Sequence, residues 1–175
     1  LVGYEVPITA YPTESGKVIV NSPGSGELKD GREDRWKNLG HHLQERGLAS
    51  LVTYNAPRPD FQVQLEWEPY SYQGASWNKI LIESLCHTID WSLENAVQLC
   101  GNESPAIYLT GFSSGGSAAG AAAHRYPSVQ RLLLLSTYDS VGDPFYEGVS
   151  NFTGDIYMVY GDEDPMAGYL ARILR

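Results

Sequence analysis

The residues best suited to chemistry lie in the run Gly111-Phe112-Ser113-Ser114-Gly115-Gly116, which has the pattern Gly-x-Ser-x-Gly. The apolar segment 106–110 precedes this run and is typical of a buried strand. The small residues of 117–123 follow it and suit a helix that packs closely against a sheet. A serine on a sharp turn from strand to helix is a nucleophile elbow, whose hydroxyl projects above the sheet and can attack a carbonyl carbon. Glycine two residues either side of Ser113 avoids a collision across the turn. The sequence therefore predicts a nucleophilic serine at 113, and the alternative is a glycine-rich turn with a surface serine.

The bulk properties of the chain describe one globular domain over residues 1–175. A net charge of -9 and scattered Lys and Arg argue against nucleic acid and against anionic membrane as partners. No apolar run approaches the length of a membrane span. The sequence shows no metal-ligand cluster, phosphate loop or dinucleotide fingerprint, so we expect no cofactor and no metal. Without a visible signal peptide, we expect a cytoplasmic protein, and the sequence leaves the oligomeric state open.

Strand-like and helix-like segments alternate along the chain. Strands are expected at 6–11, 17–22, 48–54, 106–110, 131–136 and 155–160. Apolar residues at helical spacing predict a helix around Trp36 and another from Trp77 to Cys100, with one buried face formed by Leu81, Leu85, Ile89, Leu93 and Val97. A third helix follows the elbow, a last one opens at Asp164, and loops are expected at 23–31, 56–77 and 138–154. This order predicts an α/β fold with a mostly parallel sheet and helices on both faces.

The two cysteines, Cys86 and Cys100, both fall on the long predicted helix. A helix would separate them by about 21 Å, because each residue adds about 1.5 Å. A disulfide requires Cα atoms within about 7 Å of each other. We therefore predict two unpaired core thiols, as is usual in a reducing compartment.

Three motifs, taken together and in this order, resemble those of the α/β-hydrolase family. Residues 18–26 resemble the strand and oxyanion loop, 111–116 resemble the nucleophile elbow, and 159–165 resemble the strand end that presents the triad acid. The resemblance covers nearly the whole chain and implies a single α/β-hydrolase-like domain. In the oxyanion loop, this chain has Pro23-Gly24 where family members often have His-Gly.

The resemblance also assigns roles to individual residues. Ser113 is the nucleophile, the backbone N–H of Ser114 is one oxyanion donor, and an N–H near Ser25 is the other. Asp164 is the acid that would orient a histidine. An alternative role for Asp164 is the N-cap of a helix that begins at the following proline. The remaining candidate acids are Asp162 and Asp139, and the alternative for the loop around Ser25 is a flexible connection without a site.

The histidine of a catalytic triad is missing from its usual place. The family positions it after one more strand beyond the acid, but only eleven residues follow Asp164 and none is a histidine. The four histidines present, His41, His42, His87 and His124, fall in predicted helices and are expected to be packing or surface residues. His124, for example, is about 15 Å along a helix from the nucleophile. The sequence thus predicts either a fragment without its last strand and histidine, which would leave an open sheet edge beside 155–160, or a protein that is not a triad hydrolase.

The activity implied by the resemblance is that of a serine hydrolase. It would cleave a carboxylic ester or thioester of a small-molecule acyl substrate through an acyl-enzyme. The alternatives are a non-catalytic binding module with the same fold, and a lyase or perhydrolase with that fold. Aromatic residues between 61 and 77 would either line an acyl or aryl pocket beside the site or pack onto their own domain: Phe61, Trp67, Tyr70, Tyr72 and Trp77.

Overall fold

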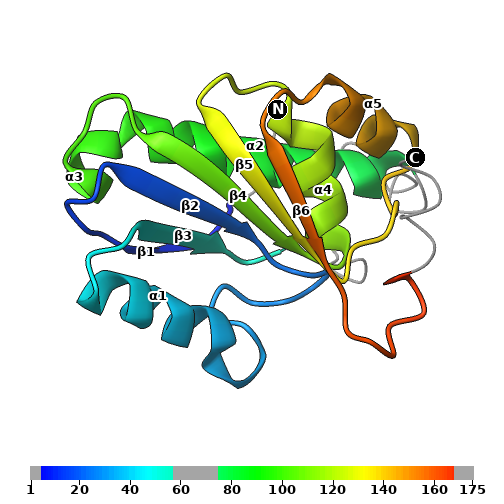
Figure 1. Ribbon diagram of the computed structural model, residues 1–175, viewed down its shortest axis with the longest axis horizontal. Coiled ribbons are helices and arrows are strands. Elements are labelled where there is room, and N and C mark those ends of the chain that lie inside the picture. The colour runs from blue at the N-terminus through cyan, green and yellow to red at the C-terminus, as the bar shows by residue number, and fades with distance from the viewer. Residues whose placement is uncertain (1–4, 57–74, 168–175) are drawn as a thin grey trace.

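The computed structural model describes residues 5–56 and 75–167, which form a sheet with helices on both faces (Figure 1). Within these residues, six strands pair in the order β1-β3-β2-β4-β5-β6. Their bounds are β1 Ile8–Tyr11, β2 Lys17–Ser22, β3 Ser50–Tyr54, β4 Ala106–Phe112, β5 Val129–Leu135 and β6 Asp155–Val159. Only the pairing of β1 with β3 is antiparallel, and the other four pairings are parallel. The predicted mostly parallel sheet is therefore confirmed.

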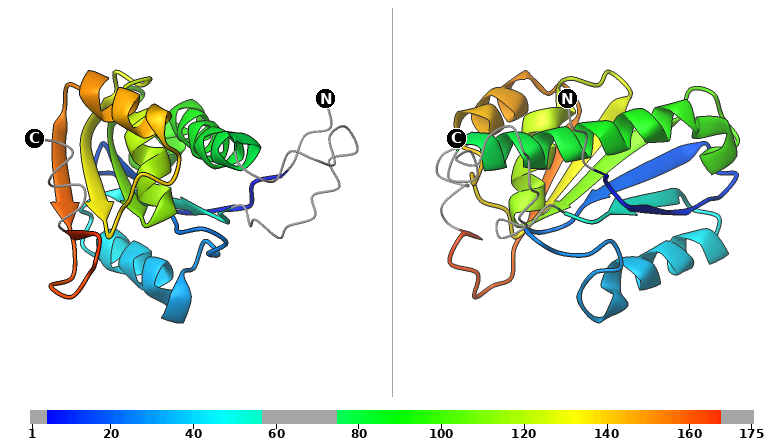
Figure 2. Two further views of the ribbon diagram at one scale, coloured as in Figure 1. Left: turned by 90° about the vertical axis from the view of Figure 1, so that its right-hand side faces the viewer. Right: turned by 180° about the vertical axis from the view of Figure 1, so that it is seen from behind.

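Helices cover the two faces of the sheet unequally, as the two further views show (Figure 2). Helix α1 (Arg35–Glu45) packs against β1 and β3 on one face, after a short 3₁₀ turn at Arg32–Asp34. Helices α2 (Ala75–Glu94) and α4 (Ser114–Ala123) pack on the opposite face, and α5 (Asp143–Asn151) packs against α4. In the described part of the chain, β6 has a paired neighbour on one side only and is an edge strand of the sheet, and the predicted open edge stays a prediction.

The core lies between the sheet and the helices α2 and α4. Every residue of α4 is buried, because its alanines and glycines let the helix approach the strands closely. The opposing face of α2 contributes Leu81, Leu85 and Ile89, which are almost fully buried, as predicted. The parallel strands β2, β3 and β5 supply the apolar side chains that these helices cover.

The predicted helix from Trp77 to Cys100 is in fact two helices. Helix α2 ends at Glu94, and α3 (Ala96–Cys100) begins after Asn95, whose φ and ψ are -106° and 19°. The side-chain amide of Asn95 donates to the Trp91 carbonyl (2.8 Å), which competes with continuation of the helix. Because the helix axis breaks here, Val97 leaves the buried face and is 56% exposed. Cys86 and Cys100 lie in different helices, buried and unpaired, so the prediction of free thiols is confirmed although the single helix was wrong.

Helix α5 lies where a loop was expected, between 138 and 154. Gly142 precedes it with a φ of 68°, and a proline stands in its first turn. Phe145 and Gly148 pack against Gly120 of α4 so closely that a Cβ atom on Gly148 would lie 2.1 Å from the Gly120 carbonyl oxygen. This short helix owes its stability to that contact, which no local pattern reveals.

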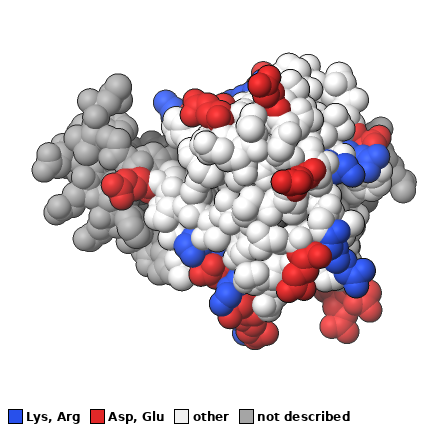
Figure 3. All heavy atoms as spheres, turned by 90° about the vertical axis from the view of Figure 1, so that its left-hand side faces the viewer, with Lys and Arg blue, Asp and Glu red and all other residues white. Residues whose placement is uncertain are grey.

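Charges on the molecule are mixed. On the face shown in Figure 3, acidic and basic side chains lie interspersed with one another, in keeping with the scattered Lys and Arg of the sequence. Among the residues that the structure describes, we find no helix with both the length and the hydropathy of a membrane span.

Candidate active site

The carboxyl ends of the parallel strands β2, β4, β5 and β6 lie side by side at the same end of the sheet (Figure 1). The strand registers place Ser22 opposite Gly111, and Leu135 opposite both Phe112 and Val159. The ladder continues one residue further, because the Ser113 N–H donates to the Leu135 carbonyl (2.9 Å) and the Ser136 N–H donates to the Val159 carbonyl (2.8 Å). The loops after β2, β4, β5 and β6 therefore start side by side, which is where ligands bind in open parallel sheets.

Ser113 occupies the sharp turn between β4 and α4. Its φ of 55° and ψ of -125° lie outside the regions that L-residues normally adopt. Its carbonyl accepts hydrogen bonds from the N–H groups of Gly116 (3.0 Å) and Ser117 (3.3 Å), so the strained residue begins the helix directly. Such strain persists only where the surrounding structure enforces it, and it is concentrated at functional sites.

The glycines around Ser113 are required by close backbone contacts. A Cβ atom on Gly111 would lie 2.4 Å from the Gly116 Cα, and one on Gly115 would lie 2.2 Å from the carbonyl oxygens of both Ser22 and Pro23. The predicted need for glycine two residues either side of the serine is confirmed. The contact of Gly115 also shows that the loop after β2 lies against the first turn of α4.

Two backbone N–H groups near the turn have no hydrogen-bond acceptor in the part of the chain that the structure describes. The Ser114 N–H is in the first turn of α4, where no intrahelical acceptor exists, and the Ser25 N–H has no hydrogen-bond acceptor among the described residues. The neighbouring Gly24 N–H is engaged, because it donates to the Glu27 carboxylate (3.2 Å). Both predicted oxyanion donors are thus available on the two loops that meet at Gly115, and their catalytic role stays a prediction.

Asp164 lies in a local turn after β6, and the helix expected to open there falls almost entirely outside the described residues. Its carboxylate accepts the Met166 N–H (2.9 Å), and its own N–H donates to the Gly161 carbonyl (3.1 Å). Burial and the negative charge of Asp164 both raise the pKa of the Tyr160 phenol. The Tyr160 hydroxyl donates to the Thr137 carbonyl (3.0 Å), which ties the loop after β6 to the loop after β5. Whether Asp164 also orients a histidine stays a prediction.

The two other candidate acids lie in different surroundings. Asp139 accepts the hydroxyl of Tyr146, so its carboxylate is engaged with α5. Asp162 is exposed on the turn after β6.

The four histidines were the candidates for a general base within the sequence. All four are among the described residues, and none hydrogen-bonds the Ser113 hydroxyl there. His41 packs edge-on against the Tyr11 ring at 5.1 Å between centroids, and His42 is exposed. His124 caps the far end of α4, with its Nδ1 buried and unpartnered. These are the packing and surface positions that the sequence predicted.

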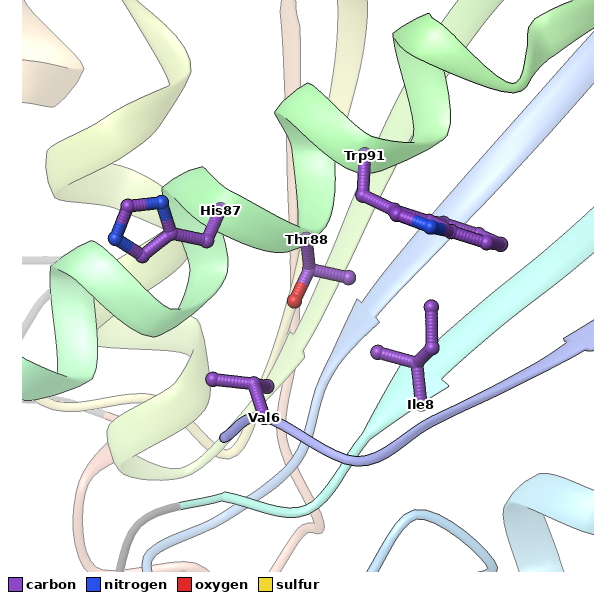
Figure 4. A pocket seen from close by; sticks show the side chains of 5 residues that line it. All are labelled: Val6, Ile8, His87, Thr88 and Trp91. Atoms are coloured by element: carbon purple, nitrogen blue, oxygen red, sulfur yellow. The ribbon is translucent and has the colours of Figure 1, made fainter. Parts of the chain in front are cut away.

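A pocket of about 210 Å³ lies between α2 and the chain that leads into β1 (Figure 4). Its lining residues are Val6, Ile8, His87, Thr88 and Trp91, and none of them is a predicted site residue. The aromatic residues at 61, 67, 70 and 72 that were expected to line an acyl or aryl pocket lie outside the described residues. Trp77 is partly buried in α2 and packs against the core. In the ranges that the structure describes, no cluster of His, Cys, Asp or Glu could hold a metal ion.

Sequence reasoning missed two charged residues beside the site. Glu27 accepts the Gly24 N–H, and the Arg35 guanidinium reaches the same carboxylate at 2.6 Å. The available signal was the three-residue spacing from Gly24 to Glu27, which brings a side chain back over a tight turn. The partner Arg35 is found only in the folded chain.

Comparison with known proteins gives matches to solved structures alone, since no family model and no curated protein matches the sequence. Esterase PE8 aligns with a TM-score of 0.64 at 16% identity, over 98% of this chain and 83% of that chain. Esterase 2 from Thermogutta terrifontis, in a form phosphorylated by paraoxon, gives 0.61 at 11% identity, over 92% and 78%. An alpha-beta serine hydrolase homologue from Coxiella burnetii gives 0.60 at 19% identity, over 97% and 74%. Together with the strand order and the strained serine, these likenesses show that the chain has the α/β-hydrolase fold.

Proposed function

We propose that this chain carries the nucleophile of a serine hydrolase that cleaves a carboxylic ester or thioester of a small-molecule acyl substrate. The observation that carries the proposal is the conformation of Ser113, a non-glycine residue with a φ of 55° at the N-terminus of a buried helix. That conformation is costly, and it places a hydroxyl where a nucleophile is needed.

The reaction would proceed through an acyl-enzyme. The Ser113 Oγ attacks the carbonyl carbon while a general base takes its proton, and the oxyanion accepts hydrogen bonds from the Ser114 and Ser25 N–H groups. The positive end of the α4 dipole adds to this stabilisation. Collapse releases the alcohol or thiol, which takes the proton from the base. Water, deprotonated by the same base, then hydrolyses the acyl-enzyme to the carboxylic acid and frees Ser113.

The base that we propose is a histidine outside the 175 residues, oriented by Asp164. The support is that the sequence has four histidines, all of them are described, and none hydrogen-bonds the Ser113 hydroxyl among the described residues. The same observation favours the non-catalytic binding module as the second candidate function.

Covalent labelling decides between the two candidates. A fluorophosphonate probe, applied to a form of the protein that includes the general base, is expected to label Ser113, and peptide mass spectrometry locates the adduct. One structure with this fold is an esterase phosphorylated by paraoxon, so the fold accommodates an organophosphate. Labelling should vanish in Ser113→Ala and persist in Ser114→Ala, which keeps the backbone donor. Labelling that survives in Ser113→Ala would refute the assignment, and an unlabelled wild type would favour the binding module.

The 175-residue chain by itself is expected to show negligible turnover of p-nitrophenyl acetate. Without a base, Ser113 stays protonated and the oxyanion donors have little to stabilise. The measurement is p-nitrophenolate release at pH 8, with Ser113→Ala as the control for background hydrolysis. Turnover that depends on Ser113 in this chain would show that the base lies within it and that our histidine assignment is wrong.

A further inference from the structure

One carboxylate holds both ends of the loop that joins β2 to α1, residues 23–31. The Glu27 Oε2 accepts the Gly24 N–H (3.2 Å), and its Oε1 accepts the Arg32 N–H (3.0 Å). The same Oε1 lies 2.6 Å from the guanidinium of Arg35, and the Glu27 side chain is only 12% exposed. The loop is therefore closed around a single anionic group instead of a turn of backbone hydrogen bonds alone.

Arg35 extends this contact to the nucleophile elbow. Its guanidinium lies 4.1 Å from the centre of the Phe112 ring and 4.7 Å from the centre of the Trp36 ring. Phe112 is the residue directly before Ser113, and its ring also supports the loop, because a Cβ atom on Gly24 would lie 3.1 Å from it. Phe112 thus contacts both Gly24 and the cation that pairs with Glu27.

Glu27 is charged at neutral pH. Burial by itself would raise the pKa of this carboxyl, but the hydrogen bonds from Arg35 and the Arg32 N–H outweigh it and lower the pKa. Charge-assisted hydrogen bonds are shorter and stronger than neutral ones, and a planar guanidinium both pairs with a carboxylate and stacks on an aromatic ring. The two charges are therefore compensated in a geometry that few other side chains could reproduce.

We propose that Glu27 and Arg35 form a clamp that positions the loop 23–31 against the nucleophile elbow, so that Ser25 keeps its N–H directed to the oxyanion. This inference rests on the proposed function. Neither residue needs to touch the substrate, so both are positioning residues. The clamp accepts the Gly24 N–H, and the Ser25 N–H has no acceptor among the described residues. Without the clamp, a loop with glycines at 24 and 26 could adopt many other conformations, in most of which the Ser25 N–H would point elsewhere.

Kinetics test the clamp in the form of the protein that includes the general base. Glu27→Gln removes the charge and leaves one acceptor oxygen, which cannot serve both amides. We expect kcat to fall by about 10- to 100-fold with KM within about twofold. A misplaced donor stabilises the transition state less, whereas the binding of the substrate is little affected. Arg35→Lys keeps the charge but loses the stack on Phe112, and should give a smaller fall. Asp155→Asn is the matched control, since it breaks an exposed ion pair with Arg131 at the opposite end of the strands.

Hydrogen exchange gives a readout that does not require activity. In the wild type the amides of Gly24 and Arg32 should be protected, and Glu27→Gln should accelerate exchange of at least one of them, while Asp155→Asn should not. The pKa of Glu27 is lowered on folding, so the clamp is present above the ordinary glutamate value of about 4.3 and is lost as pH falls through the lower folded value. Protection in the wild type should therefore be lost as pH falls below the ordinary glutamate value, with no corresponding step in Glu27→Gln.

The outcomes separate the clamp from the proposed function. If Ser113→Ala is inactive but Glu27→Gln and Arg35→Lys keep the wild-type kcat, the clamp is wrong and the proposed function stands. If Ser113→Ala retains full activity, the proposed function fails and the clamp fails with it. Reduced kcat together with faster exchange in a folded Glu27→Gln protein supports both. Should that variant melt near room temperature, Arg35→Lys decides the question by the same two measurements.

Discussion

Replacement of Ser113 by alanine is expected to lower the turnover of an ester by about four to six orders of magnitude. The alanine side chain has no group that can attack a carbonyl carbon, so only the oxyanion donors and substrate binding remain to accelerate the attack of water. The backbone of the turn should be unchanged, because alanine has the same Cβ atom as serine. The measurement is kcat for the wild type and for Ser113→Ala in the form of the protein that includes the base, with circular dichroism to show that both are folded. A fall of less than tenfold would contradict the nucleophile assignment.

Ser113→Gly provides the control for backbone strain. A non-glycine residue at φ 55° and ψ -125° costs about 1–3 kcal/mol, whereas glycine adopts positive φ freely and loses about 0.5–1 kcal/mol in unfolded-state entropy. The glycine variant should therefore be more stable than Ser113→Ala by about 1 kcal/mol and equally inactive. Urea unfolding of the two variants measures the difference. Equal stability would show that the serine is not strained and would weaken the observation that carries the proposed function.

Replacement of Gly115 by alanine is expected to destabilise the fold by about 2–3 kcal/mol and to reduce activity as well. The new Cβ atom would lie 2.2 Å from the carbonyl oxygens of Ser22 and Pro23, which are backbone atoms and cannot rotate away. Either α4 or the loop after β2 must move, and both carry a proposed oxyanion donor. The free energy of unfolding, measured in urea, and kcat should thus both be lower in this variant than in the wild type.

Gly161→Ala is the matched control for Gly115→Ala. Among the described residues other than its two chain neighbours, no atom lies within 4 Å of the position of its Cβ, and its φ is in the range of ordinary residues. The same substitution should therefore leave the free energy of unfolding nearly unchanged at this site. Similar stability for the two alanine variants would show that the close approach of α4 to the loop after β2 can relax, and would contradict the steric account of the elbow.

The sequence determined much of the sheet and the turn at Ser113, because both depend on local patterns. Strand β2 has the predicted bounds, 17–22, since a run of buried β-branched residues between a glycine and a Pro-Gly pair has few other solutions. The glycines at 111 and 115 were interpretable from spacing, because the collision they avoid occurs within a few residues of the chain. The missing histidine was also a property of the sequence alone.

Elements that depend on distant packing were not predicted. Helix α5 has nine residues and is too short to be stable by itself, so its existence follows from the contact of Phe145 and Gly148 with α4. The break at Asn95 was hidden because the apolar periodicity continues through it to Val97, a residue that the structure exposes.

The same distinction between local patterns and distant packing holds for the candidate site. The resemblance to the α/β-hydrolase family, carried by three short motifs, assigned roles to Ser113, Ser114, Ser25 and Asp164. The tertiary structure alone brought the Glu27–Arg35 pair onto Phe112. The physical reason is that the steric requirements of a tight turn are met by residues adjacent in the sequence. A charge pair and an aromatic ring from separate segments come into contact only after the fold has positioned β2, α1 and β4.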